Sequence, residues 1–88
     1  MRGDIHENYV LYRTDAQPGH RYRQIVVVDM GQFVVFAFEG DVIRPDPTFE
    51  ATSDLSGAHF HPTLQDALED AGAELRESVN AGWIRHKA

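Results

Sequence analysis

The sequence contains no cysteine, which excludes both a disulfide framework and a thiolate zinc site as the means of holding the fold together. It also lacks a long hydrophobic run, because the longest apolar stretch, residues 33–38, is far too short to cross a bilayer. Residues 1–8 do not have the apolar core of a secretory signal. We therefore predict a cytoplasmic protein that makes no membrane contact.

Recognised catalytic patterns are absent as well. Ser53, Ser56 and Ser78 stand outside any G-x-S-x-G turn, and the glycines are too scattered for a phosphate-cradling or dinucleotide-binding loop. Acid–base catalysis by paired carboxylates needs environments that push two pKa values apart, and the sequence pattern indicates none. We predict no catalytic residue, no cofactor and no enzyme activity.

Basic residues are scarce in the second half of the chain. The net charge is −6, and between residues 45 and 84 Arg76 is the only lysine or arginine. Because phosphate contacts dominate nucleic-acid affinity, an acidic domain is a poor default binder of DNA or RNA. The acidic half suits a basic protein partner, or simply keeps the protein soluble.

Three segments rich in β-branched and aromatic residues are separated by turn signals. They are residues 9–14, 21–28 and 33–38. A Gln-Pro-Gly-His turn over residues 17–20 joins the first two segments, and a tight turn centred on Met30 and Gly31 joins the second two. We expect an antiparallel meander, with residues 58–61 as a candidate for a short fourth strand.

The last segment has the periodicity of an amphipathic helix over residues 63–81. Thr63 is a good N-cap, and Asp66 three residues later completes a weak capping box. Gly82 is the expected stop, with Trp83 folding back on the last turn. The predicted apolar face consists of Leu64, Leu68, Ala71, Leu75 and Val79, and the acidic face consists of Asp66, Glu69, Asp70 and Glu77.

These elements predict a single α+β domain over residues 1–88, in which a three-stranded antiparallel meander packs against one C-terminal helix in the order β-β-β-α. Gly72, on the flank of the apolar helix face, is expected to allow a close approach of the helix to the sheet. The other segments are an N-terminal arm (1–8), a long loop (45–62) and a basic tail (84–88).

The second and third predicted strands are apolar on both faces. A two-residue second turn would put Ile25 opposite Phe36, and a first turn centred between residues 18 and 19 would put Tyr12 opposite Ile25. We expect the helix to cover the face that holds Phe36 and Phe38, since this face has more bulk to bury.

One helix cannot cover both faces of this sheet. The second face must meet the long loop, another copy of the chain or a different protein. Phe49, Leu55 and Phe60 give the loop apolar side chains to bury. If a partner or a homodimer contact covers the face instead, the predicted contact residues are Tyr9, Leu11, Arg13, Tyr22, Gln24, Val26, Phe33 and Val35.

His59 and His61 are weak candidates for metal ligands. Two residues apart, their imidazoles project from the same side of an extended segment, a spacing that suits zinc or nickel if Asp54, His20 or His6 supplies a third ligand. Because the spacing fixes no third ligand, we interpret the pair as solvated loop histidines and expect no metal.

Two short segments resemble the D-L-x-G … T-x-x-E-A-L-x-x-A pattern of HicB-type antitoxins. They are Asp-Leu-Ser-Gly at 54–57 and Thr-Leu-Gln-Asp-Ala-Leu-Glu-Asp-Ala at 63–71. The resemblance implies a small acidic domain that neutralises a basic RNA-cleaving toxin. It covers a small part of the chain, and Ser56 and Ala58 stand where the family has proline and cysteine, so we do not assign the chain to this family.

The sequence therefore favours a small acidic, non-enzymatic domain that binds another protein stoichiometrically, as an inhibitor, antitoxin, immunity protein or regulatory subunit does. The alternative is a nucleic-acid-associated accessory domain, since basic and aromatic residues that could stack on single strands gather near the first hairpin. These residues are Tyr12, Arg13, His20, Arg21, Tyr22 and Arg23. A small metal-dependent enzyme is the least favoured of the three.

Overall fold

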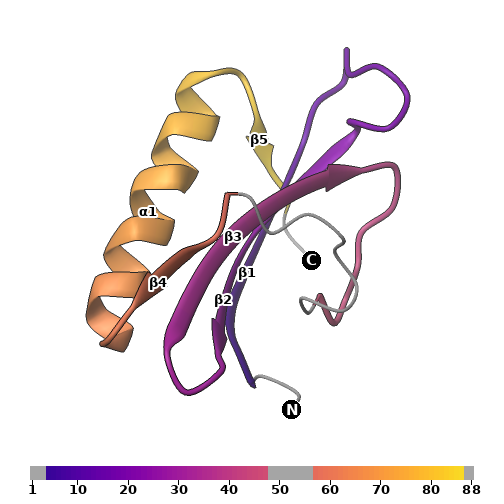
Figure 1. Cartoon of the computed structure of the whole chain (residues 1–88). Coiled ribbons are helices and arrows are strands. Elements are labelled where there is room, and N and C mark those ends of the chain that lie inside the picture. Colours follow the sequence, from indigo (N-terminus) through magenta and orange to yellow (C-terminus); the bar gives the residue numbers. More distant parts are fainter. Residues whose placement is uncertain (1–3, 48–56, 87–88) are drawn as a thin grey trace.

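Five strands and one helix form two layers in the computed structural model, which describes residues 4–47 and 57–86. The strands make one antiparallel sheet in the order β4-β3-β2-β1-β5, and the helix lies against one of its faces (Figure 1). The predicted α+β class and β-β-β-α order are confirmed, with a short strand added at each edge. The elements are β1 (Asp4–Tyr12), β2 (Tyr22–Asp29), β3 (Phe33–Gly40), β4 (His59–His61), α1 (Leu64–Asn80) and β5 (Ile84–Arg85).

The hairpin between β2 and β3 closes one residue later than predicted. Its loop comprises residues 30–32, with Gly31 at a φ of 90°, where glycine meets no steric penalty. The pairing therefore puts Ile25 opposite Ala37 instead of Phe36. Because side chains alternate along a strand, this shift of one residue moves Phe36 to the other face of the sheet.

The first hairpin is also displaced from its predicted register. The turn itself forms, since the N–H of His20 donates to the carbonyl of Gln17 at 3.0 Å. More of the loop precedes this turn than follows it, so Tyr9, and not Tyr12, lies opposite Ile25. The displacement also exchanges the two faces of β1 relative to β2.

Three predicted irregular segments contain strand residues. β1 begins at Asp4, so the predicted N-terminal arm (1–8) is wrong from that residue onward. After a bulge between Ile5 and Glu7, the first residues of β1 still pair with β2, as far as the last residue of β2, Asp29. The long loop contains β4, where a short strand was a candidate, and the predicted tail contributes β5, which pairs with the end of β1.

The face that α1 covers is not the predicted one. The helix packs on the face that holds Val35 and Ala37, because the register shift points Phe36 away from it. The buried residues of this layer are Leu11, Ile25, Val27, Val35, Ala67, Ala71 and Trp83.

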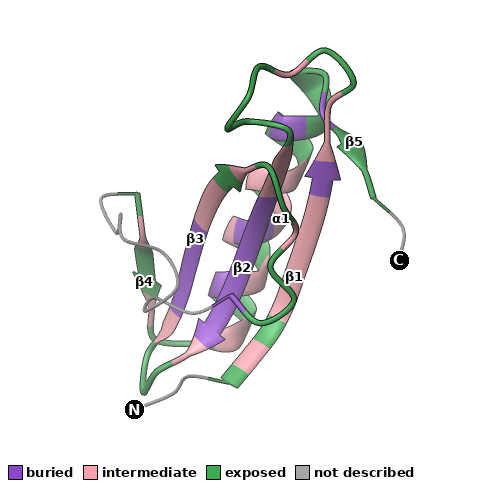
Figure 2. Ribbon diagram, turned by 90° about the vertical axis from the view of Figure 1, so that its right-hand side faces the viewer, coloured by how far each residue is buried: buried purple, intermediate pink, exposed green. Residues whose placement is uncertain are grey.

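The second face of the sheet is covered by the same chain. Residues 41–47 return across β2 (Figure 2), where the Gln24 amide donates to the carbonyl of Arg44 and accepts from the N–H of Arg44, both at 2.8 Å. Pro47 is buried, and Ala58 packs on the same layer. Loop coverage is thus the alternative that the structure shows. The buried residues on this side are Val26, Val28, Val34 and Phe36.

The apolar residues expected in this loop contribute less than predicted. Phe60 is 60% exposed, while Phe49 and Leu55 lie outside the described residues. Among the described residues, the second sheet face is therefore covered through the hydrogen bonds between Gln24 and the Arg44 backbone and through the packing of Ala58.

The helix matches its prediction closely. The Thr63 hydroxyl accepts from the N–H of Asp66 at 3.2 Å, and Gly82, at a φ of 106°, ends the helix. The N–H of Trp83 donates to the carbonyl of Ser78 at 3.0 Å, which completes a Schellman motif. Val79, predicted on the apolar face, is 45% exposed, and Ser78 is buried in its place. Within the described residues, no helix has the length and apolarity needed to cross a membrane.

Candidate functional site

The acidic face predicted for α1 divides into two parts. Asp66, Glu69 and Glu77 are exposed, and none of their carboxylates forms an ion pair with another described residue. Asp70 is instead half-buried against β4, and Glu74, which was not among the predicted site residues, lies beside Arg23. The outer part of the face is available to solvent, and the inner part belongs to a polar cluster.

His59, His61 and Asp70 form the centre of this cluster. Nδ1 of His59 donates to Oδ2 of Asp70 at 2.9 Å, and Nε2 of His61 donates to the same oxygen at 2.8 Å. The strand β4 places both imidazoles on the helix side, because residues i and i+2 share a face. Glu74 follows one helical turn after Asp70, and single ligand atoms of His59, Asp70 and Glu74 lie within 4.8 Å of one another.

The pKa of Asp70 reflects these contacts. Partial burial by itself would raise this pKa, but the hydrogen bonds from His61 and His59, together with the charge of these rings when protonated, outweigh burial and hold the pKa below its ordinary value. The carboxylate is therefore ionised at neutral pH and can act as a shared acceptor or as a metal ligand.

Arg23 joins the helix to the end of β3. Its Nη1 lies 2.9 Å from Oε2 of Glu39, and its Nη2 lies 3.6 Å from Oε2 of Glu74. Its Nε donates to the Ser78 hydroxyl at 3.0 Å. The guanidinium thus uses its three nitrogens on three partners, which explains why a serine is buried on the sheet side of α1.

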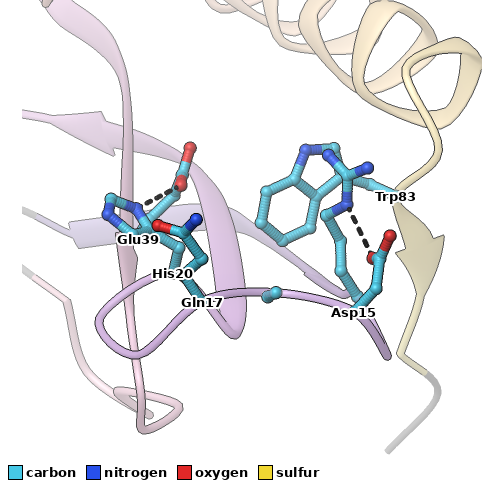
Figure 3. Close-up of a pocket in the computed structure, with 7 residues that line it drawn as sticks. Asp15, Gln17, His20, Glu39 and Trp83 are labelled. Atoms are coloured by element: carbon cyan, nitrogen blue, oxygen red, sulfur yellow. Dashed lines mark hydrogen bonds and ion pairs between the residues drawn. The ribbon is translucent and has the colours of Figure 1, made fainter.

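A pocket of about 250 Å³ opens beside Trp83, at the loop of the first hairpin (Figure 3). The Arg13 guanidinium lies over the Trp83 ring at 5.4 Å and pairs with Asp15 at 3.5 Å. Across the pocket, Nδ1 of His20 lies 2.9 Å from Oε1 of Glu39. Each basic group named here faces a carboxylate, so the pocket does not present a positive surface.

The aromatic residues of the hairpin lie away from this pocket. Tyr12 and Tyr22 pair across β1 and β2 on the face opposite α1. Each ring lies nearly perpendicular to the ring of His86, with 6.2 Å between ring centroids. Arg13 and Arg23 lie on the helix side. The sheet therefore separates Tyr12 and Tyr22 from Arg13 and Arg23, while Arg85 and His86 line a pocket with the two tyrosines.

The predicted partner-contact residues do not form one surface. Tyr9, Leu11, Phe33 and Val35 lie under α1, while Gln24 and Val26 lie on the second face, under residues of the loop. The two register errors caused this mixing, because each exchanged the faces of one strand. The predicted single surface is therefore wrong, and of its members Leu11, Gln24, Val26 and Val35 are fully buried.

Sequence reasoning found the histidine pair but not its carboxylates. Asp54 lies outside the described residues, and His20 is bound to Glu39 instead. Asp70 and Glu74 are four residues apart on one helix flank, a spacing that could have identified them as ligands once β4 was known to lie beside α1. That neighbourhood is a tertiary feature and has no signal in the spacing alone.

Comparison of the chain with protein-family models, with curated proteins and with solved structures found no match.

Proposed function

We propose that this protein is a stoichiometric protein-binding domain that docks a basic partner on the outer face of α1. The observation that carries the proposal is the group of exposed carboxylates formed by Asp66, Glu69 and Glu77, which lack ion pairs with other described residues. Most of the net charge of −6 belongs to the same half of the chain, since residues 45–84 contain eight acidic residues and Arg76 alone as a basic residue.

The helix is favoured over the sheet as the docking surface. α1 occupies one face of the sheet, and residues 41–47 with Ala58 lie on the other. The strands at the edges, β4 and β5, comprise three and two residues, too few to offer a long template for adding another strand. The outer face of α1 needs no rearrangement to become accessible.

Charge favours a different protein over a second copy of this chain. Two outer helix faces brought together would place carboxylates against carboxylates, which costs free energy, whereas lysines or arginines on a partner would pair with them. Exposed charges of this kind mainly raise the rate of association and make it sensitive to salt. The cytoplasmic location predicted from the sequence belongs to the same proposal.

Charge reversal with a matched control tests the proposal. We would compare Glu69→Lys/Glu77→Lys with Asp4→Lys/Asp15→Lys, which changes the net charge equally at exposed positions outside the helix. Each variant and the wild type would be used as bait in extracts of the native host, and binding of the captured basic protein would then be measured with purified components.

We expect the wild type and the control to bind the same basic protein with 1:1 stoichiometry, and the helix variant to bind at least about tenfold more weakly, which corresponds to about 1.4 kcal/mol. Added salt should weaken the wild-type complex. Equal binding by the helix variant and the wild type, or no basic partner at all, would contradict the proposal.

A further inference from the structure

We propose that β4 and α1 together form a binding site for a divalent transition metal of the zinc type. The ligands are an imidazole nitrogen of His59 and carboxylate oxygens of Asp70 and Glu74, which lie within 4.8 Å of one another, with Nε2 of His61, hydrogen-bonded to Asp70, as the fourth. Imidazole and carboxylate groups are a donor set that suits Zn²⁺. The site is independent of the proposed docking surface, since it uses none of the exposed outer carboxylates.

Two distances within the cluster are close to those that such an ion requires. In a tetrahedral zinc site with bonds of about 2.0 Å, neighbouring ligand atoms are about 3.3 Å apart. The two nitrogens lie 2.9 and 2.8 Å from Oδ2 of Asp70. Separating these two pairs by about half an ångström gives the spacing of bound ligands. The ligand atoms of His59, Asp70 and Glu74 lie within 4.8 Å of one another, so side-chain rotation has to bring Glu74 to the same spacing around the ion.

The backbone around the site already holds the ligands in place. His59 and His61 sit on β4, which is paired to Val35 and Phe33 of β3. Asp70 and Glu74 lie on successive turns of α1, which packs on the same sheet. Ligands on regular elements lose less conformational freedom on binding than ligands on loops.

The charges of the site also suit a cation. When the imidazoles are neutral, Asp70 and Glu74 give the site two negative charges. Of these two carboxylates, Arg23 approaches only that of Glu74, at 3.6 Å. Coordination requires the facing nitrogen of each imidazole to give up its proton, either to the outer ring nitrogen or to solvent. The ion then takes the place of two hydrogen bonds that converge on one oxygen. His59 is exposed, which gives the ion a path from solvent.

Metal titration of the purified chain tests the inference. Zn²⁺ binding would be measured by calorimetry and Co²⁺ binding by visible absorbance, which reports tetrahedral coordination. The variants are His61→Ala and Asp70→Asn. The matched control is His20→Ala. It removes another histidine–carboxylate pair, in which Nδ1 of His20 lies 2.9 Å from Oε1 of Glu39.

We expect the wild type and His20→Ala to bind one ion per chain, and both cluster variants to bind at least about tenfold more weakly, since even outer partners of metal ligands contribute that much. Zinc should also shift the imidazole nitrogen signals of His59 and His61 in NMR spectra of the wild type, and leave those of His6 unchanged. This second measurement does not depend on whether a variant folds. Substoichiometric binding by the wild type, or an equal loss in His20→Ala, would overturn the inference.

Discussion

Ser78 shows how a single polar side chain can be buried where an apolar residue was expected. The helical period placed Val79 on the apolar face, but the serine at the preceding position faces the sheet, where its hydroxyl accepts from Nε of Arg23 at 3.0 Å. A buried hydroxyl without a partner would cost free energy, and here the guanidinium satisfies it. The pairing of Arg23 with Ser78 joins residues far apart in the sequence, so no local pattern could indicate it.

At the residue scale, this contact predicts that replacing the polar Ser78 by alanine costs more stability than replacing the apolar Val79. Ser78→Ala should lower the free energy of unfolding by about 1 kcal/mol, because Nε of Arg23 loses its acceptor in a partly buried position. Val79→Ala should change it by less than about 0.5 kcal/mol, because this side chain is largely in solvent. Urea denaturation of both variants measures the difference. A larger cost for Val79→Ala would show that the helical period, and not the structure, orients this turn correctly.

The helix is the element that its own sequence specifies most completely. Thr63 begins it, Gly82 ends it, and Trp83 folds back as expected. Gly72 is different, because a Cβ built at this position would have no neighbour within 4 Å. The predicted close approach of helix and sheet at Gly72 is therefore wrong. The small residues that do face the sheet are Ala67 and Ala71.

At the element scale, two glycine-to-alanine substitutions should act in opposite directions. Gly72→Ala should stabilise the protein by up to about 1 kcal/mol, since alanine is the better helix former and the space is open. Gly82→Ala should destabilise it by about 1 kcal/mol, since its φ of 106° is unfavourable for a residue with a side chain. Thermal melts followed by circular dichroism measure both effects, and shifts of the same sign would contradict this account.

At the scale of the whole molecule, both faces of the sheet are apolar and only one helix among the described residues is available to cover them. A second, smaller apolar layer lies beneath the segment that follows β3, where Gln24 binds both backbone polar groups of Arg44. Gln24 is only 1% exposed, and its side chain also donates to Oδ1 of Asn8 at 2.9 Å. Gln24 is therefore a polar anchor that fixes this segment beside the apolar layer of Val26, Val28, Val34 and Phe36.

Because the second face is covered, we can predict the outcome of a lysine substitution on it. Val26→Lys should unfold the protein, because an unpaired ammonium beneath the covering segment costs several kcal/mol, a large part of the stability of a small domain. Val42→Lys is the control, because Val42 is 67% exposed in the same covering segment. Circular dichroism and light scattering distinguish the two variants. A folded, monomeric Val26→Lys would mean that the face opens easily and is free to accept a partner.

Local chemistry in the sequence determined the three central strands, the helix, their order and the limits of the helix. Strand propensity, turn residues and caps act over a few residues, so Thr63, Gly82 and the Gln17–His20 turn could be read directly. The same reasoning identified the histidine pair, because side chains at i and i+2 share a face of any strand.

Tertiary structure alone decided the register, the covered face and the partners of the polar residues. One additional loop residue beside Gly31 exchanged the faces of β3, an outcome that the apolar pattern could not resolve because both faces of β2 and β3 are apolar. Likewise, Asp70 meets His59 and His61 only because β4 joins the edge of the sheet beside α1. Such contacts depend on long-range packing, which the spacing of residues along the chain does not encode.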